Sequence, residues 1–136
     1  MRRVLGAAAA VLLAVACGGG DDGDIDLFCE RIDALIDDDP FARLPDEATP
    51  TDLRHAFEQL RDGTEAVAAA APDELRALAR QYANTTAQLD DLLAGAGYRG
   101  DEVDSLEYRQ RAREQSQAAS RLEVAAGRDC PGGAGD

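Results

Sequence analysis

Apolar residues recur every three or four positions over most of the chain, and this spacing limits most strongly how the chain can fold. The clearest series consists of Leu53, Phe57, Leu60, Thr64, Val67 and Ala71. Because an α-helix turns once every 3.6 residues, such positions form one stripe along a helix, whereas a strand requires alternation. The spacing therefore predicts helices that pack through these stripes and argues against a sheet.

Four helical segments follow from the stripes and from the prolines and glycines between them. The expected ranges are 25–37, 49–71, 72–95 and 101–126, with a loop over residues 41–45. Thr49 and Pro50 are typical of a helix start. Pro72 separates the second helix from the third, and Gly95 is expected to cap the third. The last stripe is the weakest and leaves open whether its first residues form a separate short helix. It consists of Val103, Leu106, Tyr108, Ala112, Ala119, Leu122 and Ala126.

The first 17 residues have the features of a bacterial export signal. Two arginines precede an apolar run over residues 4–16 that is too short to span a bilayer. Residues 12–16 followed by Cys17 resemble the lipobox of bacterial lipoproteins, although Ala14 stands where leucine is commonest. The resemblance implies that residues 1–16 are a signal peptide and that Cys17 carries a lipid. The alternative is an ordinary secretory peptide cleaved nearby.

A lipid on Cys17 implies a location outside the cytoplasm, with the chain anchored to the outer face of the cell membrane. Residues 17–24 are then expected to form a Gly- and Asp-rich tether, of which six flexible residues reach at most about 20 Å. The helical domain over residues 25–130 would work close to the membrane. Residues 131–136 are expected to be a disordered tail.

Two further cysteines, Cys29 and Cys130, lie near the two ends of the predicted helical domain. Short connections between four helices favour an all-α, up-down-up-down bundle, in which the first helix starts where the last one ends. The topology therefore brings these cysteines together, and an oxidising compartment normally closes such a pair. We expect a Cys29–Cys130 disulfide.

The expected mature chain is strongly acidic. Without residues 1–16 it retains 12 basic and 27 acidic residues, a formal net charge of −15. Such a surface repels phosphate backbones and argues against nucleic acid as a partner. All 14 basic residues are arginines, and alanine, glycine and aspartate are abundant. This bias indicates a bacterium with a GC-rich genome.

Several short motifs of the mature chain resemble those of small secreted helical proteins of actinobacteria. They are Phe28-Cys29, Asp39-Pro40-Phe41, Ala71-Pro72-Asp73-Glu74-Leu75, Gly97-Tyr98 and Cys130-Pro131-Gly132. These motifs concern packing, capping and the disulfide, and the group has no assigned activity. The resemblance implies an exported helical fold and no particular chemistry.

Three patterns with known chemical uses have simpler structural interpretations. The alternating acids over residues 22–26 copy a calcium loop, but Leu27 stands where that loop needs glycine, so capping of a helix start is favoured over calcium. Residues 95–100 match the dinucleotide-binding pattern GxGxxG but follow a helix instead of a strand, which favours a helix cap and loop. His55, the only histidine, lies off the apolar stripe and is expected to be solvated.

No set of residues predicts catalysis, a cofactor or a metal site. Asp90 and Asp91 diverge by about 100° on a helix, so we interpret them as part of a solvated face. With the last two cysteines joined, no cysteine nucleophile is expected, and the serines have no recognisable base partner. We therefore expect the protein not to be an enzyme.

The one basic cluster of the chain consists of Arg109, Arg111 and Arg113. It is either a site for an anion or a partner, or a set of arginines that lies beside the first helix and offsets its acids over residues 26–39. The second interpretation is favoured, because exposed ion pairs are common without function.

These observations predict a non-enzymatic lipoprotein of the cell envelope that binds another envelope or secreted protein near the membrane. The alternative is a carrier that holds a small molecule between its helices. A carrier needs a cavity, which the alanine-rich pattern permits.

Overall fold

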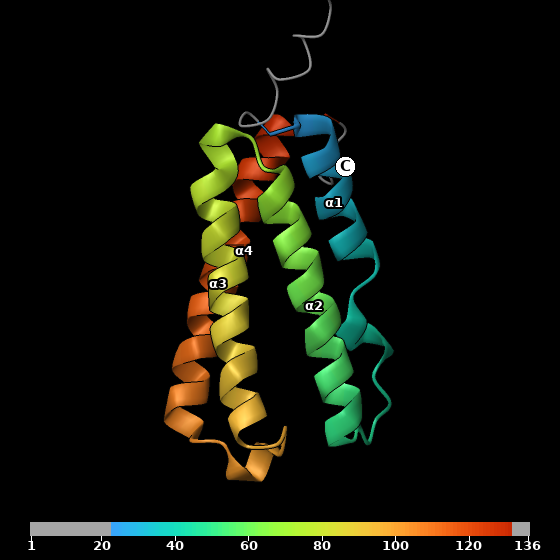
Figure 1. Ribbon diagram of the computed structural model, residues 1–136, viewed down its shortest axis with the longest axis vertical. Coiled ribbons are helices and arrows are strands. Elements are labelled where there is room, and N and C mark those ends of the chain that lie inside the picture. The colour runs from blue at the N-terminus through green and yellow to red at the C-terminus, as the bar shows by residue number, and fades with distance from the viewer. Residues whose placement is uncertain (1–22, 132–136) are drawn as a thin grey trace, which may run out of the picture.

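The computed structural model describes residues 23–131, and every regular element within them is helical. The α-helices are α1 (Ile25–Asp37), α2 (Pro50–Ala70), α3 (Asp73–Gly95) and α4 (Ser105–Asp129), and the short 3-10 helices are η2 (Pro40–Arg43) and η3 (Gly100–Glu102). Successive α-helices run in opposite directions (Figure 1), which confirms the predicted all-α bundle. No helix of this range is long and apolar enough to cross a membrane. The expected signal peptide, the lipidation site at Cys17 and residues 132–136 lie outside the described residues.

Side-chain caps place the first two helix starts where the sequence predicts them. The Asp24 carboxylate accepts hydrogen bonds from the amides of Asp26 and Leu27 at 3.0 and 3.2 Å. Thr49 and Asp52 form a reciprocal capping box, in which each side chain accepts a hydrogen bond from the other residue's amide. These caps satisfy amides that the helix itself leaves unpaired, so the starts depend on local sequence.

The end of α3 differs from the expectation that Gly95 caps it. Gly95 is still helical, and the left-handed backbone conformation belongs to Gly97 and Tyr98, with φ of 63° and 59°. The Tyr98 amide donates to the Leu93 carbonyl at 2.8 Å. The Gly97 amide donates to the Ala94 carbonyl at 3.0 Å, which completes a Schellman motif. The later turn packs Tyr98 against the apolar cluster that contains Leu93.

The last helical segment is divided, which settles the question that its weak stripe leaves open. η3 is separate, and α4 begins after Asp104, whose carboxylate accepts hydrogen bonds from the amides of Leu106 and Glu107. Leu106 is 72% exposed, although the sequence pattern placed it on the core stripe. Leu106 is exposed because it lies two residues before Tyr108. This spacing places it about 200° around the axis of α4 from the stripe that begins at Tyr108.

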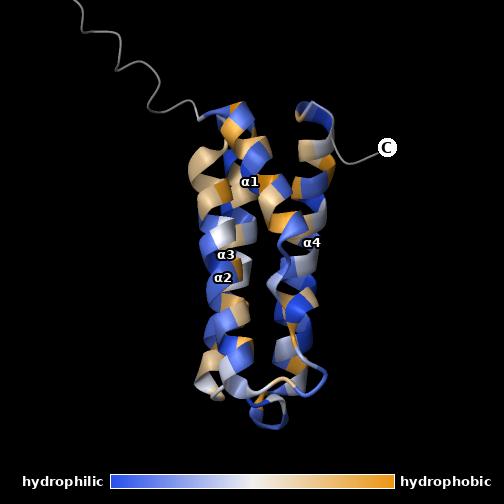
Figure 2. Ribbon diagram, turned by 90° about the vertical axis from the view of Figure 1, so that its right-hand side faces the viewer, coloured by the Kyte–Doolittle hydropathy of each residue, from blue (hydrophilic) through white to orange (hydrophobic). Residues whose placement is uncertain are grey.

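The core is formed mainly by small and aliphatic side chains at the predicted stripe positions. Its larger cluster consists of Phe28, Cys29, Ile32, Val67, Ala70, Ala71, Leu75, Ala79, Leu122 and Ala126. A smaller cluster of Phe57, Leu89 and Leu93 lies further along the bundle. Hydrophobic segments recur between hydrophilic ones along each helix (Figure 2), as expected where one stripe of each helix faces inward.

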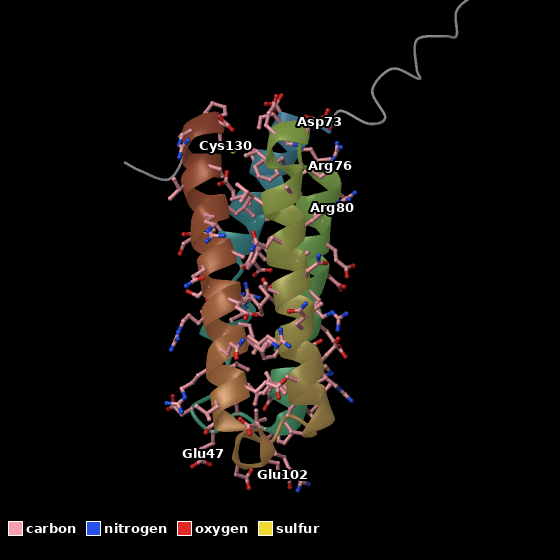
Figure 3. The ribbon with its side chains drawn as sticks, turned by 90° about the vertical axis from the view of Figure 1, so that its left-hand side faces the viewer. Glu47, Asp73, Arg76, Arg80, Glu102 and Cys130 are labelled. Carbon is pink, nitrogen blue, oxygen red and sulfur yellow. A yellow bond between two sulfur atoms is a disulfide. The ribbon has the colours of Figure 1, made fainter. Side chains whose placement is uncertain are left out.

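Cys29 and Cys130 form the predicted disulfide, with their Cα atoms 5.6 Å apart. We call this end of the bundle the disulfide end. Figure 3 shows Cys130 at the same end as Asp73, the first residue of α3, whereas Glu47 and Glu102 lie at the opposite end, here called the far end. The predicted pairing of the two cysteines is correct because helices that alternate in direction bring the end of α4 back to the start of α1.

The last residues of the expected tether are in contact with the bundle. The Asp24 amide donates to the Ala70 carbonyl at 3.1 Å. Gly23 has φ of 68°, and a Cβ atom there would lie 2.3 Å from the Ala71 carbonyl oxygen. The backbone therefore passes too close to the junction of α2 and α3 for any residue with a side chain at position 23, and residues 23 and 24 pack on the bundle.

α1 is much shorter than the other helices. It has 13 residues, whereas α2, α3 and α4 have 21, 23 and 25. At 1.5 Å per residue, α1 is about 20 Å long and α3 about 35 Å long. η2 follows α1, and the chain then continues to the far end before α2 begins (Figure 1). The far half of the bundle therefore has three long helices, and no fourth one completes it within residues 23–131.

Candidate functional site

A groove of about 490 Å³ opens on the side of the bundle where α1 ends. We call it the flank groove and define it by Ile36, Phe41, Tyr82, Ala112, Ala119 and Glu123, which are among its lining residues. These residues come from α1, η2, α3 and α4, so the groove exists only in the folded chain. Its position follows from the shortness of α1, which leaves part of α4 without a helical neighbour on this side.

The α4 wall of the flank groove is a regular helical stripe. Tyr108, Ala112, Gln115, Ala119 and Leu122 follow one another at steps of four, three, four and three, which places them on one face of α4. Leu122 is buried, whereas the other four are partly or largely exposed. The sequence pattern thus found most of this stripe correctly, but α1 covers it only at the Leu122 end.

α1 and η2 form the facing wall and part of the floor. Ile36 is 50% exposed, although it lies four residues after the buried Ile32 and therefore on the apolar stripe of α1. Its exposure has a simple cause: α1 ends one residue later, before a neighbouring element can cover that turn. On the floor, Phe41 packs edge-to-face on Phe57, with ring centroids 5.0 Å apart. The groove is therefore apolar on both sides.

The charged residues of the flank groove are both acidic. Asp39, at the start of η2, and Glu123, on α4, are exposed at its rim. Burial raises the pKa of Tyr82, and the negative charges of Glu123 and Asp39 raise it further, so both carboxylates act on this hydroxyl. Asp39 accepts a hydrogen bond from the Phe41 amide at 2.9 Å. Glu123 makes no hydrogen bond or ion pair with any side chain in residues 23–131.

A second cavity of about 400 Å³ lies towards the far end, and no charged residue of the described chain lines it. We call it the end cavity. Phe41, Phe57 and Tyr108 line both this cavity and the flank groove, so the two spaces adjoin. Leu93 and Val103 complete its apolar character. The structure therefore provides an apolar surface that continues from the flank to the far end.

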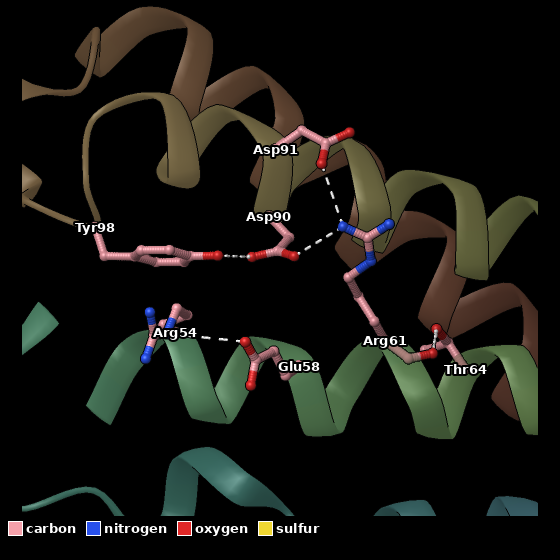
Figure 4. Close-up of polar contacts among 7 residues, drawn as sticks. All are labelled: Arg54, Glu58, Arg61, Thr64, Asp90, Asp91 and Tyr98. Atoms are coloured by element: carbon pink, nitrogen blue, oxygen red, sulfur yellow. Dashed lines mark hydrogen bonds and ion pairs between the residues drawn. The ribbon is translucent and has the colours of Figure 1, made fainter. Parts of the chain in front are cut away.

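A buried polar network lies beside these spaces and was not predicted. Asp90 is 4% exposed, so its assignment to a solvated face was wrong, whereas the neighbouring Asp91 is exposed. The Tyr98 hydroxyl donates to one Asp90 oxygen at 2.6 Å, and Arg61 Nη1 donates to the other at 2.9 Å (Figure 4). Arg61 also donates to Asp91 at 3.2 Å. The network joins α2, α3 and the turn after α3.

The helical spacing contains a signal for the burial of Asp90. Asp90 lies four residues after Thr86 and three before Leu93, and both of these are buried. Its acidic character suggested solvent exposure, but a carboxylate is tolerated in a core when both oxygens have hydrogen-bond donors. Because Arg61 and Tyr98 supply those donors from the chain itself, we assign the network to structure and not to chemistry on a substrate.

The network predicts unusual titration of one tyrosine. Burial, followed by the hydrogen bond to Asp90, raises the pKa of Tyr98 from 10.0 to about 12. A folded-state pKa above the unfolded value means that the neutral phenol stabilises the fold fully below about pH 10, and that this contribution is lost as the pH rises towards 12. We expect near-ultraviolet absorbance to show a phenolate that forms only near pH 12. Tyr98→Phe should remove that last step, and an unchanged curve in the variant would contradict the assignment.

The three arginines singled out in the sequence do not converge on one site. The Arg109 side chain donates to the Ser105 carbonyl of its own helix at 3.1 Å, and Arg111 donates to Gln88 on α3 at 3.1 Å. Arg113 is exposed. Within residues 23–131 no ion pair joins α4 to α1. The arginines of α4 therefore do not form the expected contacts with the acidic residues of the first helix. The reason is again that α1 ends before it reaches this part of α4.

The remaining sequence patterns have structural roles or lie at the surface. Asp24 caps α1 in the stretch that copies a calcium loop. His55 is exposed, as predicted. Residues 95–100 follow a helix and not a strand: they contain the last residue of α3, the turn at Gly97 and the first residue of η3. Within the described range, no three side chains of histidine, cysteine, aspartate or glutamate are grouped so that they could hold a metal ion.

Comparison with models of protein families, with curated proteins and with solved structures found no match to this chain. The functional evidence therefore comes from the residues of the site and not from likeness to another fold. The Asp90 network and Arg111 are occupied by contacts within the chain. The flank groove, with the adjoining end cavity, offers uncovered apolar surface to another molecule and is therefore the candidate site.

Proposed function

We propose that this chain is a non-enzymatic, lipid-anchored protein of the cell envelope that binds a partner protein in its flank groove. The observation that carries the proposal is the stripe of α4 from Tyr108 to Ala119, which lies open where α1 ends. Contiguous apolar surface that remains uncovered in a water-soluble bundle is typical of an interaction site. The groove between helices is also a common form of protein recognition site.

The proposed anchor gives this groove an orientation. α1 begins at the disulfide end, so a lipid on Cys17 would hold that end towards the membrane. The flank groove lies beside the last turns of α1 and continues past the end of that helix, about 20 Å along the bundle, and the end cavity lies further still. Both spaces would therefore be directed away from the lipid surface, where a partner in the envelope can reach them.

The charge of the chain supports the same arrangement. A formal net charge of −15 for residues 17–136 repels anionic lipid headgroups, which keeps the helical domain from lying flat on the membrane. With a tether that reaches about 20 Å at most, the domain stays near the membrane without adhering to it. These conditions suit a partner that is itself located at the membrane.

Site-directed photo-cross-linking in the native envelope tests the proposal. A photoreactive amino acid at Ala112 or Ala119 places the probe in the flank groove, whereas one at Gln117 places it on the opposite face of α4. We expect the two groove positions to give the same cross-linked protein and Gln117 to give none. The anchor predicts that Cys17→Ala weakens this adduct, because the untethered domain loses its high local concentration at the membrane.

Equal cross-linking from the groove positions and from Gln117 would contradict a specific site. The carrier alternative is favoured by one observation, the uncharged end cavity of about 400 Å³, which lies within the range of small-molecule sites. Absence of any protein adduct, together with an apolar small molecule retained in native mass spectrometry, would replace the proposed function with that alternative.

A further inference from the structure

We propose that the occupant of the flank groove is an amphipathic helix that carries basic residues and lies along α4. The inference rests on the proposed function and names the chemistry of the partner. Three features of the site support it: the length and spacing of the open stripe, the position of α1, and the acidic residues at the rim.

The shape of the open surface fits a helix. From Tyr108 to Ala119 the open stripe extends over twelve residues, or about 17 Å and three helical turns, and Leu122 continues it beneath α1. Steps of four and three are the spacing by which a helix packs along another helix at a small crossing angle. Ala112 and Ala119 stand at two of these positions, and their small side chains allow a close approach of the two backbones.

α1 demonstrates how such a helix would lie. Phe28 and Ile32 of α1 share one apolar cluster with Leu122 and Ala126 of α4, near the disulfide end. Figure 2 shows α1 beside this part of α4, with a loop continuing below it. A partner helix that extended the line of α1 towards the far end would cover the rest of the same stripe and complete a four-helix cross-section.

The acidic residues at the rim of the flank groove favour an occupant that carries positive charge. Asp39 and Glu123 lie on different sides of the flank groove, and no arginine of the described chain lines it. Glu123 has no hydrogen-bond or ion-pair partner in residues 23–131, so a basic side chain of the occupant would not have to displace an existing contact. The acidic surface of the whole domain would also speed the approach of a cationic segment.

The same charges disfavour other occupants. A second copy of this acidic chain would bring like charges to the rim, which is costly at an interface. An anionic lipid would meet the same repulsion. A small apolar molecule is better suited to the end cavity, which has no charged lining residue in the described chain, than to an open stripe about three helical turns long.

The test uses two synthetic peptides of about 18 residues that share a leucine and alanine stripe of helical spacing. They differ only in the residues beside that stripe, which are arginine in one and glutamate in the other. Binding to the exported chain, held in nanodiscs of zwitterionic lipid, is measured by fluorescence anisotropy. We expect the arginine peptide to bind about tenfold more tightly, since each exposed charge pair contributes a factor of a few.

Matched variants test the charge preference. Asp39→Asn with Glu123→Gln should reduce it to about threefold or less, and asparagine can still cap η2. Asp33→Asn with Glu107→Gln makes the same change in net charge at exposed positions outside the groove and should keep the preference. If the preference survives the rim variant, or is lost equally in both variants, the inference about basic residues is overturned.

Two further variants test the groove itself. Ala119→Trp fills it and should abolish peptide binding, whereas Gln117→Trp adds the same side chain on the opposite face of α4 and should not. The helix site is overturned if wild type binds neither peptide or if Ala119→Trp binds as wild type does. Either failure is separable from the proposed function, because a cross-linked partner could still be captured from the groove positions. Absence of that adduct would instead overturn the proposed function.

Discussion

Replacing Cys29 and Cys130 together with alanine should lower the free energy of unfolding by about 2 to 5 kcal/mol, the usual cost of losing a native disulfide. The bond joins residues 101 apart, and the chain-entropy model gives about 4.7 kcal/mol for a loop of that length. α1 is also short and meets α4 only near the disulfide end, so the bond is the main link that closes the bundle there. The melting temperature should fall by roughly 10 to 20 °C.

Thermal unfolding followed by circular dichroism measures this change. A reducing agent should lower the melting temperature of wild type to near that of the double variant and leave the variant unaffected. This comparison separates the bond from the small loss of packing at Cys29, which is 9% exposed. Equal melting temperatures in oxidised and reduced wild type would show that the bond contributes no stability.

Arg61→Leu should destabilise the fold by about 2 kcal/mol, because it leaves the buried Asp90 carboxylate with Tyr98 as its only side-chain donor. Removing one partner of a fully buried ion pair costs about 3 to 5 kcal/mol. The Arg61 side chain is 34% exposed, so water can replace part of the lost interaction and the expected cost is lower. Urea denaturation provides the measurement.

Arg54→Leu is the matched control, since it removes an arginine from the same helix. Arg54 pairs with Glu58 at 3.8 Å, and both side chains are more than half exposed (Figure 4). Its loss should change stability by less than about 0.5 kcal/mol. In the Asp90→Asn background, the effect of Arg61→Leu should shrink, because the buried charge is gone. Equal losses of unfolding free energy in Arg61→Leu and Arg54→Leu would show that the burial of Asp90 does not make its ion pair more important for stability.

The helices could be predicted because their limits depend on neighbouring residues. Asp24 and Thr49 cap helices with their own side chains, so their effect can be inferred from a few residues of sequence. The end of α3 at Gly95 was predicted correctly, but its left-handed capping glycine is Gly97 and not Gly95, because the turn is also determined by the packing of Tyr98 on a distant cluster. Local signals therefore determined the helices, and tertiary contacts shifted one cap.

The candidate site could be predicted only in part. The helical stripe with Ala112 and Ala119 was found from spacing, but spacing does not tell whether another helix covers a stripe. Exposure of Ile36 and burial of Asp90 have the same origin, since each depends on what neighbouring elements place opposite that residue. The arginines around Arg111 were evident in the sequence, but their contacts lie along α4 and on α3 and not on α1.

The sequence by itself determined the all-α class, the approximate helices and the pairing of Cys29 with Cys130, because periodicity, capping and chain direction are local or topological properties. The tertiary structure alone decided where the bundle is left open and which carboxylate is buried. Both depend on the relative lengths of α1 and α4 and on the phase of each helix against its neighbours. These quantities arise only when segments distant in the sequence pack together, and the proposed binding site depends on them.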